Sequence, residues 1–459
     1  MTLWEYIKGK MLEHPTQTIS EKGVSMTYED LCIFAESFAK KLTADYYGIL
    51  CNYEMSSAMA LLACIAAGKP AVPLPTRYGK EMYVKIWERA EPPCIITDMG
   101  GGLNIIPVSP ESCPEPPEKN TAVILFTSGS TGKPKGIMLS DDNLICNIED
   151  VYSYFPITDN DTILISRPLY HSSVLTGEFL VALCAGAKIV FTSESFQPLN
   201  ILKVLKTNNI TVFGSTPTLM TMLSRFVREP DELNVRLLSV SGECMTEGMA
   251  RTIRKAFPKA DIYCGYGLSE ASPRVTYLPA EDFDDDSTCA GIALPSVKIR
   301  IARPNGKDAA RGEVGEILVK GNNVTIGYFD DAERTRNTVR HGWLHTGDLG
   351  YISKNGRLYI KGRKDDMIIR AGMNIYPAEI ENILSTDGRV CEVQVYGYSK
   401  NDTQEIGMTI SGDFYSEHEV MKMCQQYLPS YQMPSKIDLT SELEKLAGGK
   451  RKRRVQNGI

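Results

Sequence analysis

Several residue types are scarce or scattered in this 459-residue sequence, and each shortage excludes a class of site. There are only five histidines, and the twelve cysteines form no CxxC pair, so the spacing typical of a structural zinc site is missing. His341 and His345 have the spacing of an HExxH metal motif, but Gly342 stands where the catalytic glutamate belongs. We therefore expect no resident zinc, and we expect the cysteines to be buried, reduced thiols.

The sequence also lacks a strong charge of either sign, with 50 Lys and Arg against 56 Asp and Glu and a formal net charge of −6. A nucleic-acid binder needs a basic face that replaces counterions, so we expect no nucleic-acid partner. No apolar run reaches the roughly 18 residues needed to cross a bilayer. Residues 1–15 lack the basic and apolar regions of a signal peptide. We expect no membrane association and a cytoplasmic location.

The pattern of apolar residues predicts an α/β protein. Short β-rich runs alternate with amphipathic helical stretches as far as Ser287, and this alternation is typical of parallel sheets covered by helices on both faces. After Ser287 the runs become strands without long helices, which predicts a β-barrel-like subdomain. From Asp365 onward the pattern is mixed again. We therefore expect a large N-terminal domain over 1–364, with two parallel-sheet subdomains and the β subdomain, and a small mobile α+β domain over 365–459.

The strongest local signal is a run of glycines, hydroxyls and lysines directly after the apolar stretch 122–126. Glycine lets backbone N–H groups turn inward, the hydroxyls can donate to phosphate oxygens, and a lysine can offset the phosphate charge. The run is not a Walker A loop, because only two residues separate Gly129 from Gly132 and a proline follows Lys133. The alternative is a flexible surface loop. The spacing indicates an anion-binding loop made of Thr127, Ser128, Gly129, Ser130, Thr131, Gly132, Lys133 and Lys135.

This loop resembles the signature of the adenylate-forming superfamily, which contains acyl- and aryl-CoA synthetases, peptide-synthetase adenylation domains and luciferases. Further motifs of that superfamily match in the same order along nearly the whole chain. They are Arg167-Pro168-Leu169-Tyr170-His171, Ser241-Gly242-Glu243, Tyr266-Gly267-Leu268-Ser269-Glu270, Gly312-Glu313-Val314-Gly315-Glu316, Thr346-Gly347-Asp348, Gly362-Arg363-Lys364-Asp365 and Gly449-Lys450.

The resemblance implies that these segments bind ATP. The Gly/Ser/Thr loop would hold the β- and γ-phosphates, Gly242, Glu243, Tyr266 and Gly267 would lie around the adenine, and Ser269 would contact the α-phosphate. Asp348 would accept hydrogen bonds from the ribose hydroxyls, reinforced by Arg363. Glu270 would ligate Mg²⁺, a hard ion that prefers carboxylate oxygen. Taken singly, Glu270 or Asp348 would be read as a solvated carboxylate.

The resemblance also implies two half-reactions performed by a rotating C-terminal domain. Lys450 would be the catalytic lysine of adenylation, because an ammonium can neutralise the charges of the phosphorus centre and the attacking carboxylate. The alternative is that Lys450, which begins the basic run 450–454, belongs to a solvated tail or an address signal. Asp365 matches the hinge position, and Gly372 would line a tunnel for the phosphopantetheine thiol. The alternative for the hinge is an ordinary interdomain loop.

The acid-binding pocket follows from the same resemblance. It would contain His171, Ser172, Thr176, Gly214, Ser215, Gly242 and Leu268, with His171 either catalytic or a packed aromatic gate. No acidic residue follows His171 until Glu178, so the ammonium of a free α-amino acid would lack a partner. We expect an aromatic or short acyl carboxylic acid as the substrate.

The sequence therefore predicts an AMP-forming acid–thiol ligase that uses ATP, Mg²⁺ and CoA. Its partners would be a small carboxylic acid and CoA. The alternative acceptor is an acyl or peptidyl carrier protein, which presents the same phosphopantetheine arm. A non-catalytic nucleotide sensor and a luciferase-like oxygenase share the same motifs and stay open at this stage.

Overall fold

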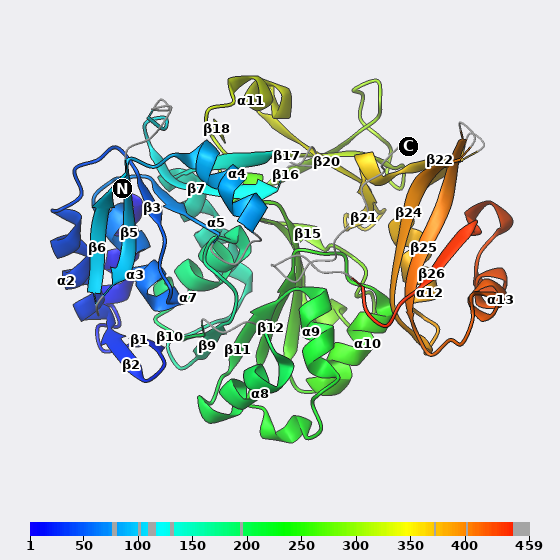
Figure 1. The fold of residues 1–459 in the computed structure, drawn as a ribbon, viewed down its shortest axis with the longest axis horizontal. Helices are drawn as coiled ribbons and strands as arrows, with labels where there is room; N and C mark the ends of the chain where they lie inside the picture. The colour runs from blue at the N-terminus through cyan, green and yellow to red at the C-terminus, as the bar shows by residue number, and fades with distance from the viewer. Residues whose placement is uncertain are drawn as a thin grey trace.

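The structure is a computed structural model that describes residues 1–75, 80–99, 102–108, 116–128, 133–192, 196–370, 373–400 and 403–443. Two large sheets, a smaller antiparallel sheet and a C-terminal unit lie around a common centre (Figure 1). The expected α/β class and the change to antiparallel strands after Ser287 are confirmed.

The N-terminal sheet has parallel strands at its centre and antiparallel strands at its edges. Both of its faces are buried. Val123 and Leu125 belong to one apolar core, and the alternate residues Ile124 and Phe126 belong to another, as the two-residue period of a strand requires. Its strands are, in spatial order, β18 (Gly327–Tyr328), β8 (Pro134–Ser140), β7 (Thr121–Ser128), β4 (Ala71–Pro73), β3 (Tyr47–Ile49), β5 (Cys94–Met99) and β6 (Gly102–Pro107).

The central sheet repeats this arrangement on a larger scale. Leu237 packs in the core between the two large sheets, whereas Leu238 packs in the core on the opposite face. Its inner strands are parallel, so their carboxyl ends meet at one edge. The spatial order is β15 (Ile292–Ala293), β14 (Arg274–Leu278), β13 (Asp261–Gly267), β12 (Leu237–Ser241), β11 (Val212–Ser215), β9 (Thr162–Ile165), β10 (Lys188–Phe191), β1 (Thr18–Glu21) and β2 (Val24–Thr27).

Helices cover both faces of the two sheets. The helices between the sheets share one apolar core with them: α1 (Leu3–Leu12), α2 (Tyr28–Ala39), α3 (Glu54–Ala66), α5 (Asp141–Tyr154), α6 (Ser172–Val174), the π-helix η1 (Leu175–Leu180) and α7 (Val181–Cys184). The outer face of the central sheet carries α8 (Pro198–Thr207), α9 (Pro217–Ser224) and α10 (Glu247–Ala256), and the outer face of the N-terminal sheet carries α4 (Lys80–Ala90). This burial on both faces explains the continuous apolar runs in the sequence.

The β subdomain lies above the central sheet in Figure 1. It is an antiparallel sheet of β16 (Lys298–Ala302), β17 (Gly315–Lys320), β20 (Trp343–Ile352), β19 (Val339–Arg340) and β21 (Leu358–Arg363), with α11 (Ala332–Thr338) beside it. The β20–β21 hairpin sets Asp348 opposite Arg363 in register. A motif residue from each strand therefore reaches the same place.

The C-terminal unit has an apolar core of its own, drawn from residues between Ile368 and Ile437. It touches α10, where Arg251 Nη2 donates to Thr386 O at 3.2 Å and a Cβ added at Gly248 would lie 2.5 Å from Ser385 O. The unit comprises β22 (Ile368–Arg370), β23 (Met373–Ile375), α12 (Pro377–Leu384), β24 (Val390–Lys400), β25 (Thr403–Gly412), α13 (Glu417–Tyr427) and β26 (Lys436–Leu439).

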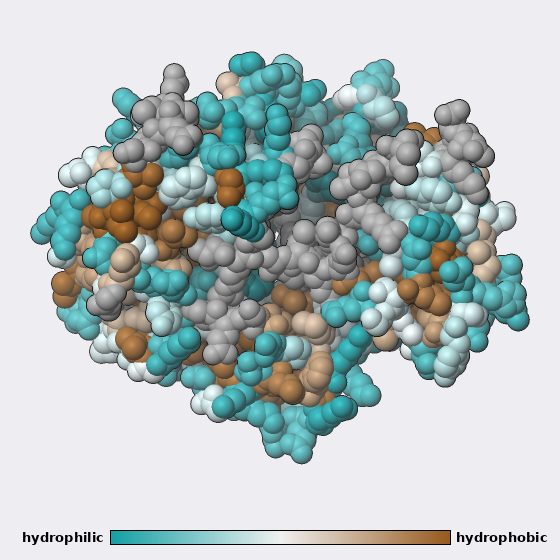
Figure 2. Space-filling model, viewed as in Figure 1, coloured by the Kyte–Doolittle hydropathy of each residue, from teal (hydrophilic) through white to brown (hydrophobic). Residues whose placement is uncertain are grey.

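The face shown in Figure 2 is largely hydrophilic, with apolar side chains gathered in separate patches. Among the described residues, no helix is long and apolar enough to span a membrane. The cysteines that the structure describes are all free thiols.

Candidate active site

The anion-binding loop connects β7 to β8. Thr127 pairs in register with Lys135 across this hairpin, so both residues stand at the base of the loop. The hydroxyl of Thr127 is buried and has no hydrogen-bond partner among the described residues, whereas Lys133 is exposed. Gly129, Ser130, Thr131 and Gly132, and the side chain of Ser128, lie outside the described part of the chain.

Glu270 lies next to the base of this loop. Its carboxylate pairs with Lys135 and accepts a hydrogen bond from the hydroxyl of Tyr328 at 2.9 Å. Burial alone would raise the pKa of Glu270, but the charge of Lys135 and the hydrogen bonds outweigh it and lower the pKa below its usual value. Glu270 is therefore a buried carboxylate held in its ionised form.

Asp348 forms a second buried carboxylate site. Tyr266 OH donates to Asp348 Oδ2 at 2.6 Å, and Arg363 Nη1 donates to Asp348 Oδ1 at 3.0 Å. Burial nevertheless raises the pKa of Asp348, and the negative charge of Glu270 adds to that rise. The two carboxylates are therefore close enough to interact electrostatically, although the motifs that carry them are far apart in the sequence.

The predicted pocket residues from two motifs also meet. Ser172 Oγ lies 2.9 Å from Ser269 Oγ, which joins α6 to the turn that carries Glu270. The ring of His171 lies beside that of Tyr170, with centroids 4.6 Å apart. Gly267 is required here, because an added Cβ would lie 1.9 Å from Pro273 O. This turn also brings Leu268, with its backbone N–H donating to Pro273 O at 2.9 Å, to the same side.

The other predicted pocket residues lie at the carboxyl end of the central sheet. Gly214 and Ser215 end β11, and Thr176 in η1 is fully buried. Gly242 follows β12 with a φ of +99°, which a residue with a side chain adopts at a cost. The carboxylate of Glu243 accepts a hydrogen bond from Thr218 N at 3.1 Å, so it caps a backbone N–H in the first turn of α9.

Three buried charged residues and one tyrosine were missed by the sequence interpretation. Arg167 pairs with Glu178, and Arg274 reaches the hydroxyls of Ser239 and Ser241. Arg167 was noticed only as the start of a motif, and Glu178 only as a distant acid. For Glu178 in η1 and Arg274 in β14, the available signal was a charged residue at an inward position of a helix or strand, whereas Arg167 lies in the bend after β9. Tyr328, which contacts Glu270, carried no such signal.

The remaining predictions concern the C-terminal part. Asp365 is exposed in the 3₁₀ turn Lys364–Asp366, between the β subdomain and β22. Gly372 and Lys450 lie outside the described residues. The described chain holds no cluster of three His, Cys, Asp or Glu side chains that would hold a metal by itself.

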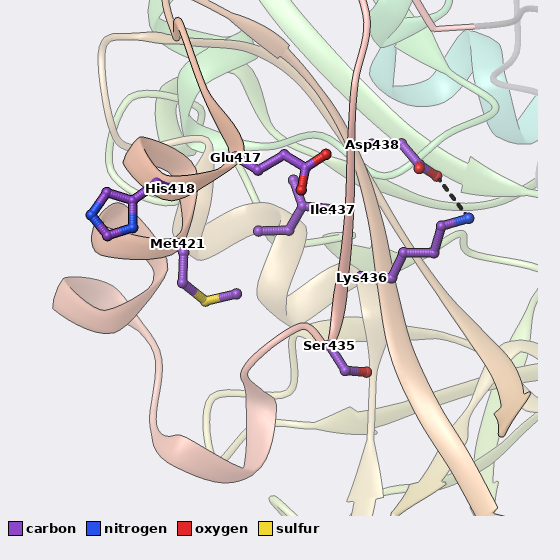
Figure 3. A pocket seen from close by; sticks show the side chains of 7 residues that line it. All are labelled: Glu417, His418, Met421, Ser435, Lys436, Ile437 and Asp438. Carbon is purple, nitrogen blue, oxygen red and sulfur yellow. Dashed lines mark ion pairs between the residues drawn. The ribbon is translucent and has the colours of Figure 1, made fainter. Parts of the chain in front are cut away.

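A cavity of about 470 Å³ lies elsewhere, between α13 and β26. It is lined by Glu417, His418, Met421, Ser435, Lys436, Ile437 and Asp438, and Figure 3 shows Lys436 and Asp438 paired beside it, 3.5 Å apart. None of the predicted site residues lines it.

Comparison with known proteins agrees with this geometry. The family model described as AMP-binding enzyme matches residues 10–329 of this chain. The 2-succinylbenzoate–CoA ligase of Bacillus cereus (strain Q1) is 30% identical over 420 residues, which is 87% of this chain and 86% of the relative. The corresponding ligase of Bacillus mycoides (strain KBAB4) is 31% identical over 422 residues, again 87% and 86%.

Solved structures match over almost the whole chain. O-succinylbenzoate coenzyme A synthetase from Bacillus subtilis, in complex with ATP and a magnesium ion, superposes with a TM-score of 0.83 at 25% identity, covering 97% of this chain and 98% of that one. ATP-bound MatB from Rhodopseudomonas palustris gives a TM-score of 0.84 at 26% identity, covering 98% and 97%. The chain belongs to the AMP-binding enzyme family.

Proposed function

We propose that this protein is an acid–thiol ligase that joins a small carboxylic acid to CoA at the expense of ATP. In the first half-reaction a carboxylate oxygen attacks the α-phosphorus, the bond to pyrophosphate breaks, and an acyl-adenylate forms. In the second, the CoA thiolate attacks the acyl carbon and AMP leaves. Both steps rely on positioning and on charge stabilisation, since phosphate is a far better leaving group than oxide.

The nucleotide would be held by the residues that the structure gathers around the two carboxylates. The hydroxyl of Thr127 is buried and has no hydrogen-bond partner among the described residues. The phosphate tail would be held by this hydroxyl and by Lys133, together with Ser128, Gly129, Ser130, Thr131 and Gly132. Asp348 and Arg363 would bind the ribose, and Gly242, Glu243, Tyr266 and Gly267 would surround the base. Asp348 has lone pairs beyond the two already used, so it can accept the ribose hydroxyls.

The fit of Mg²⁺ rests on Glu270. A carboxylate kept ionised by Lys135 and Tyr328 suits a hard divalent ion. Because no cluster of acids surrounds it in the described residues, phosphate oxygens and water would supply the other ligands. When bound, the ion neutralises charge on the phosphates. Lys135 would keep Glu270 ionised while the ion is absent.

The acid would bind on the opposite side of the Ser172–Ser269 contact, beside His171, Thr176, Gly214, Ser215 and Leu268. There the hydroxyl of Ser269, which lies 2.9 Å from Ser172 Oγ, would contact the α-phosphate. Lys450 would approach for adenylation only, Asp365 would be the hinge, and Gly372 would line the thiol tunnel. The reaction uses soluble cofactors, and the cysteines that the structure describes are free thiols, which supports a cytoplasmic location.

The observation that carries this proposal is the convergence of Lys135, Glu270, Asp348 and Arg363 from four separate motifs on one place. The test is ATP–pyrophosphate exchange measured with a panel of carboxylic acids, followed by thioester formation with CoA or with a holo carrier protein. Acid-dependent exchange and a CoA thioester are expected. Failure of every acid to support exchange would contradict the proposal, and a thioester formed only on the carrier protein would replace CoA as the acceptor.

A further inference from the structure

The chain between β17 and β18 is polar and yet buried. Asn323 is fully buried, and Thr325 and Tyr328 are each 4% exposed. β17 belongs to the β subdomain, whereas β18 pairs with β8 of the N-terminal sheet, so the chain crosses here from one unit to the other. We call residues 321–328 the connecting segment. Buried polar groups need hydrogen-bond partners, and several partners of this segment lie in the turn that carries Glu270.

The connecting segment holds the backbone of this turn. Thr325 N donates to Glu270 O at 2.8 Å, and Asn323 Nδ2 donates to two further carbonyl oxygens of the turn, each at 3.0 Å. Ser272 Oγ donates in return to Asn323 O at 2.7 Å. Ser272 has a φ of +68°, which a residue with a side chain adopts at a cost. The turn therefore keeps its shape through contacts from outside, and most of these come from one segment.

The same segment holds the side chain of Glu270. The hydroxyl of Tyr328 donates to Glu270 Oε1 at 2.9 Å, and Lys135 Nζ donates to the same oxygen. No hydrogen bond from a described side chain reaches Glu270 Oε2. One carboxylate oxygen is therefore fixed by two donors, while the other keeps its lone pairs for a ligand.

Tyr328 is itself held firmly. Its backbone pairs with β8, and its N–H donates to Thr335 Oγ1 in α11 at 2.9 Å. Two cations contact its ring: Lys135 Nζ and the guanidinium carbon of Arg334 each lie 5.6 Å from the ring centroid. The hydroxyl therefore reaches Glu270 from a ring that is fixed by its backbone and by both cations.

We propose that Tyr328 and Asn323 are positioning residues for the adenylation step. They fix the turn and one carboxylate oxygen of Glu270, so that Oε2 is presented to the magnesium ion that accompanies ATP. A glutamate that is already held in one rotamer loses less conformational entropy when the ion binds. Neither positioning residue belongs to the motifs identified in the sequence. This inference rests on the proposed ligase activity and adds two residues to its machinery.

The test removes the hydroxyl of Tyr328 and measures binding without turnover. The Kd for ATP is determined by calorimetry on the full chain without acid, once with Mg²⁺ and once with EDTA, and the ratio of the two values gives the coupling between ion and nucleotide. Tyr328→Phe keeps the ring and its cation contacts. We expect the variant to lower this ratio about tenfold or more, since a hydrogen bond to a charged group is strong, and to leave the Kd in EDTA unchanged.

The matched control is Tyr359→Phe, which also loses a hydroxyl that donates to a carboxylate, that of Asp286 at 2.5 Å. It should leave the ratio unchanged. Raised Mg²⁺ should restore acid-dependent pyrophosphate exchange by Tyr328→Phe, and thioester formation from added acyl-adenylate should be unaffected. A purely structural role would instead weaken ATP binding equally with Mg²⁺ and with EDTA.

A second variant tests the turn. Asn323→Ser is too short to reach both carbonyl oxygens and is expected to lower the ratio about threefold, since it loses only hydrogen bonds to neutral groups. Circular dichroism checks the fold of both variants, and either one alone decides. An unchanged ratio, or equal losses with Mg²⁺ and EDTA, would overturn the inference and leave the ligase activity intact. Absence of ATP binding by the unaltered chain would contradict the ligase activity and the inference with it.

Discussion

The candidate active site contains two groups of charged side chains around buried carboxylates, and the groups differ in how their charges are balanced. In the nucleotide-side cluster, defined as Lys135, Glu270, Tyr266, Tyr328, Asp348 and Arg363, each carboxylate has its own cation. In the acid-side cluster, defined as Arg167, Glu178, Ser239, Ser241 and Arg274, Arg167 pairs with Glu178, whereas Arg274 donates only to the two serine hydroxyls among the described residues. The charged side chains of the first cluster thus balance one another, whereas those of the second carry one surplus positive charge. The difference suggests that the first serves chemistry common to the family and the second serves the choice of acid.

The largest expected effect comes from removing a charge on the nucleotide side. Glu270→Gln is expected to lower kcat for adenylation by about 10²–10³-fold, because the ion that stabilises the phosphates loses its carboxylate. The loss should be the same for every acid that supports adenylation, measured as pyrophosphate release. Glu313→Gln, at a surface pair with Arg303, is the control. A loss whose size depends on the acid used would contradict the assignment of Glu270 to the nucleotide side.

The next effect separates the two half-reactions. Lys450→Ala is expected to lower adenylate formation by about 10²-fold, since it removes a cation needed at the phosphorus centre, and to spare thioester formation from added acyl-adenylate. Asp365→Pro is expected to do the reverse, because proline fixes the φ angle that a hinge must change. Each half-reaction is followed separately by rapid quenching. If both variants slow the same step, the domain rotation is wrong for this protein.

A smaller effect is expected at the ribose site. Asp348→Asn keeps the shape of the side chain but weakens the hydrogen bonds that an ionised acceptor makes, so KM for ATP should rise about tenfold. KM for the acid should not change, because the acid lies on the other side of Ser269. Titration of both substrates gives the two constants. A rise in KM for the acid alone would place Asp348 in the wrong half of the site.

Apart from Tyr328, the residues of the nucleotide-side cluster could be named from the sequence, because each stands at a fixed position in a motif whose neighbours in the chain identify it. Cap residues in the sequence also predict the ends of two helices. Thr27 caps the start of α2 by accepting a hydrogen bond from Asp30 N at 3.1 Å. Gly68, which has a φ of +62°, follows the end of α3. The spacing of apolar residues predicts one amphipathic helix from Thr27 to Asp45, but α2 ends at Ala39. The chain there must turn into β3, and Ala44 N donates to Tyr47 OH at 2.7 Å.

The acid-side cluster was not predictable because its members are brought together by the order of strands. Arg274 is separated from Arg167 by more than a hundred residues, and its inward position follows from the antiparallel pairing of β14 with β13. A strand pattern shows that alternate residues are buried, but it does not show which side chain from another element balances a buried charge. That information lies in the topology.

The smallest expected effect is on stability, and it contrasts the two carboxylates. Because the pKa of Glu270 is lowered, its ionisation stabilises the folded state above its ordinary pKa of 4.5, and this contribution is lost only as the pH falls through the lower folded value. Because the pKa of Asp348 is raised, its ionisation destabilises the folded state once the pH rises above 3.8 and through the higher folded value. At pH 7, Glu270→Gln should therefore destabilise the protein and Asp348→Asn should stabilise it, each by about 1 kcal/mol. Near pH 4 the gain from Asp348→Asn should have nearly vanished while the loss from Glu270→Gln persists. Urea unfolding midpoints across this pH range measure both, and a stabilising effect of Asp348→Asn that does not depend on pH would show that burial of its charge is not the cause.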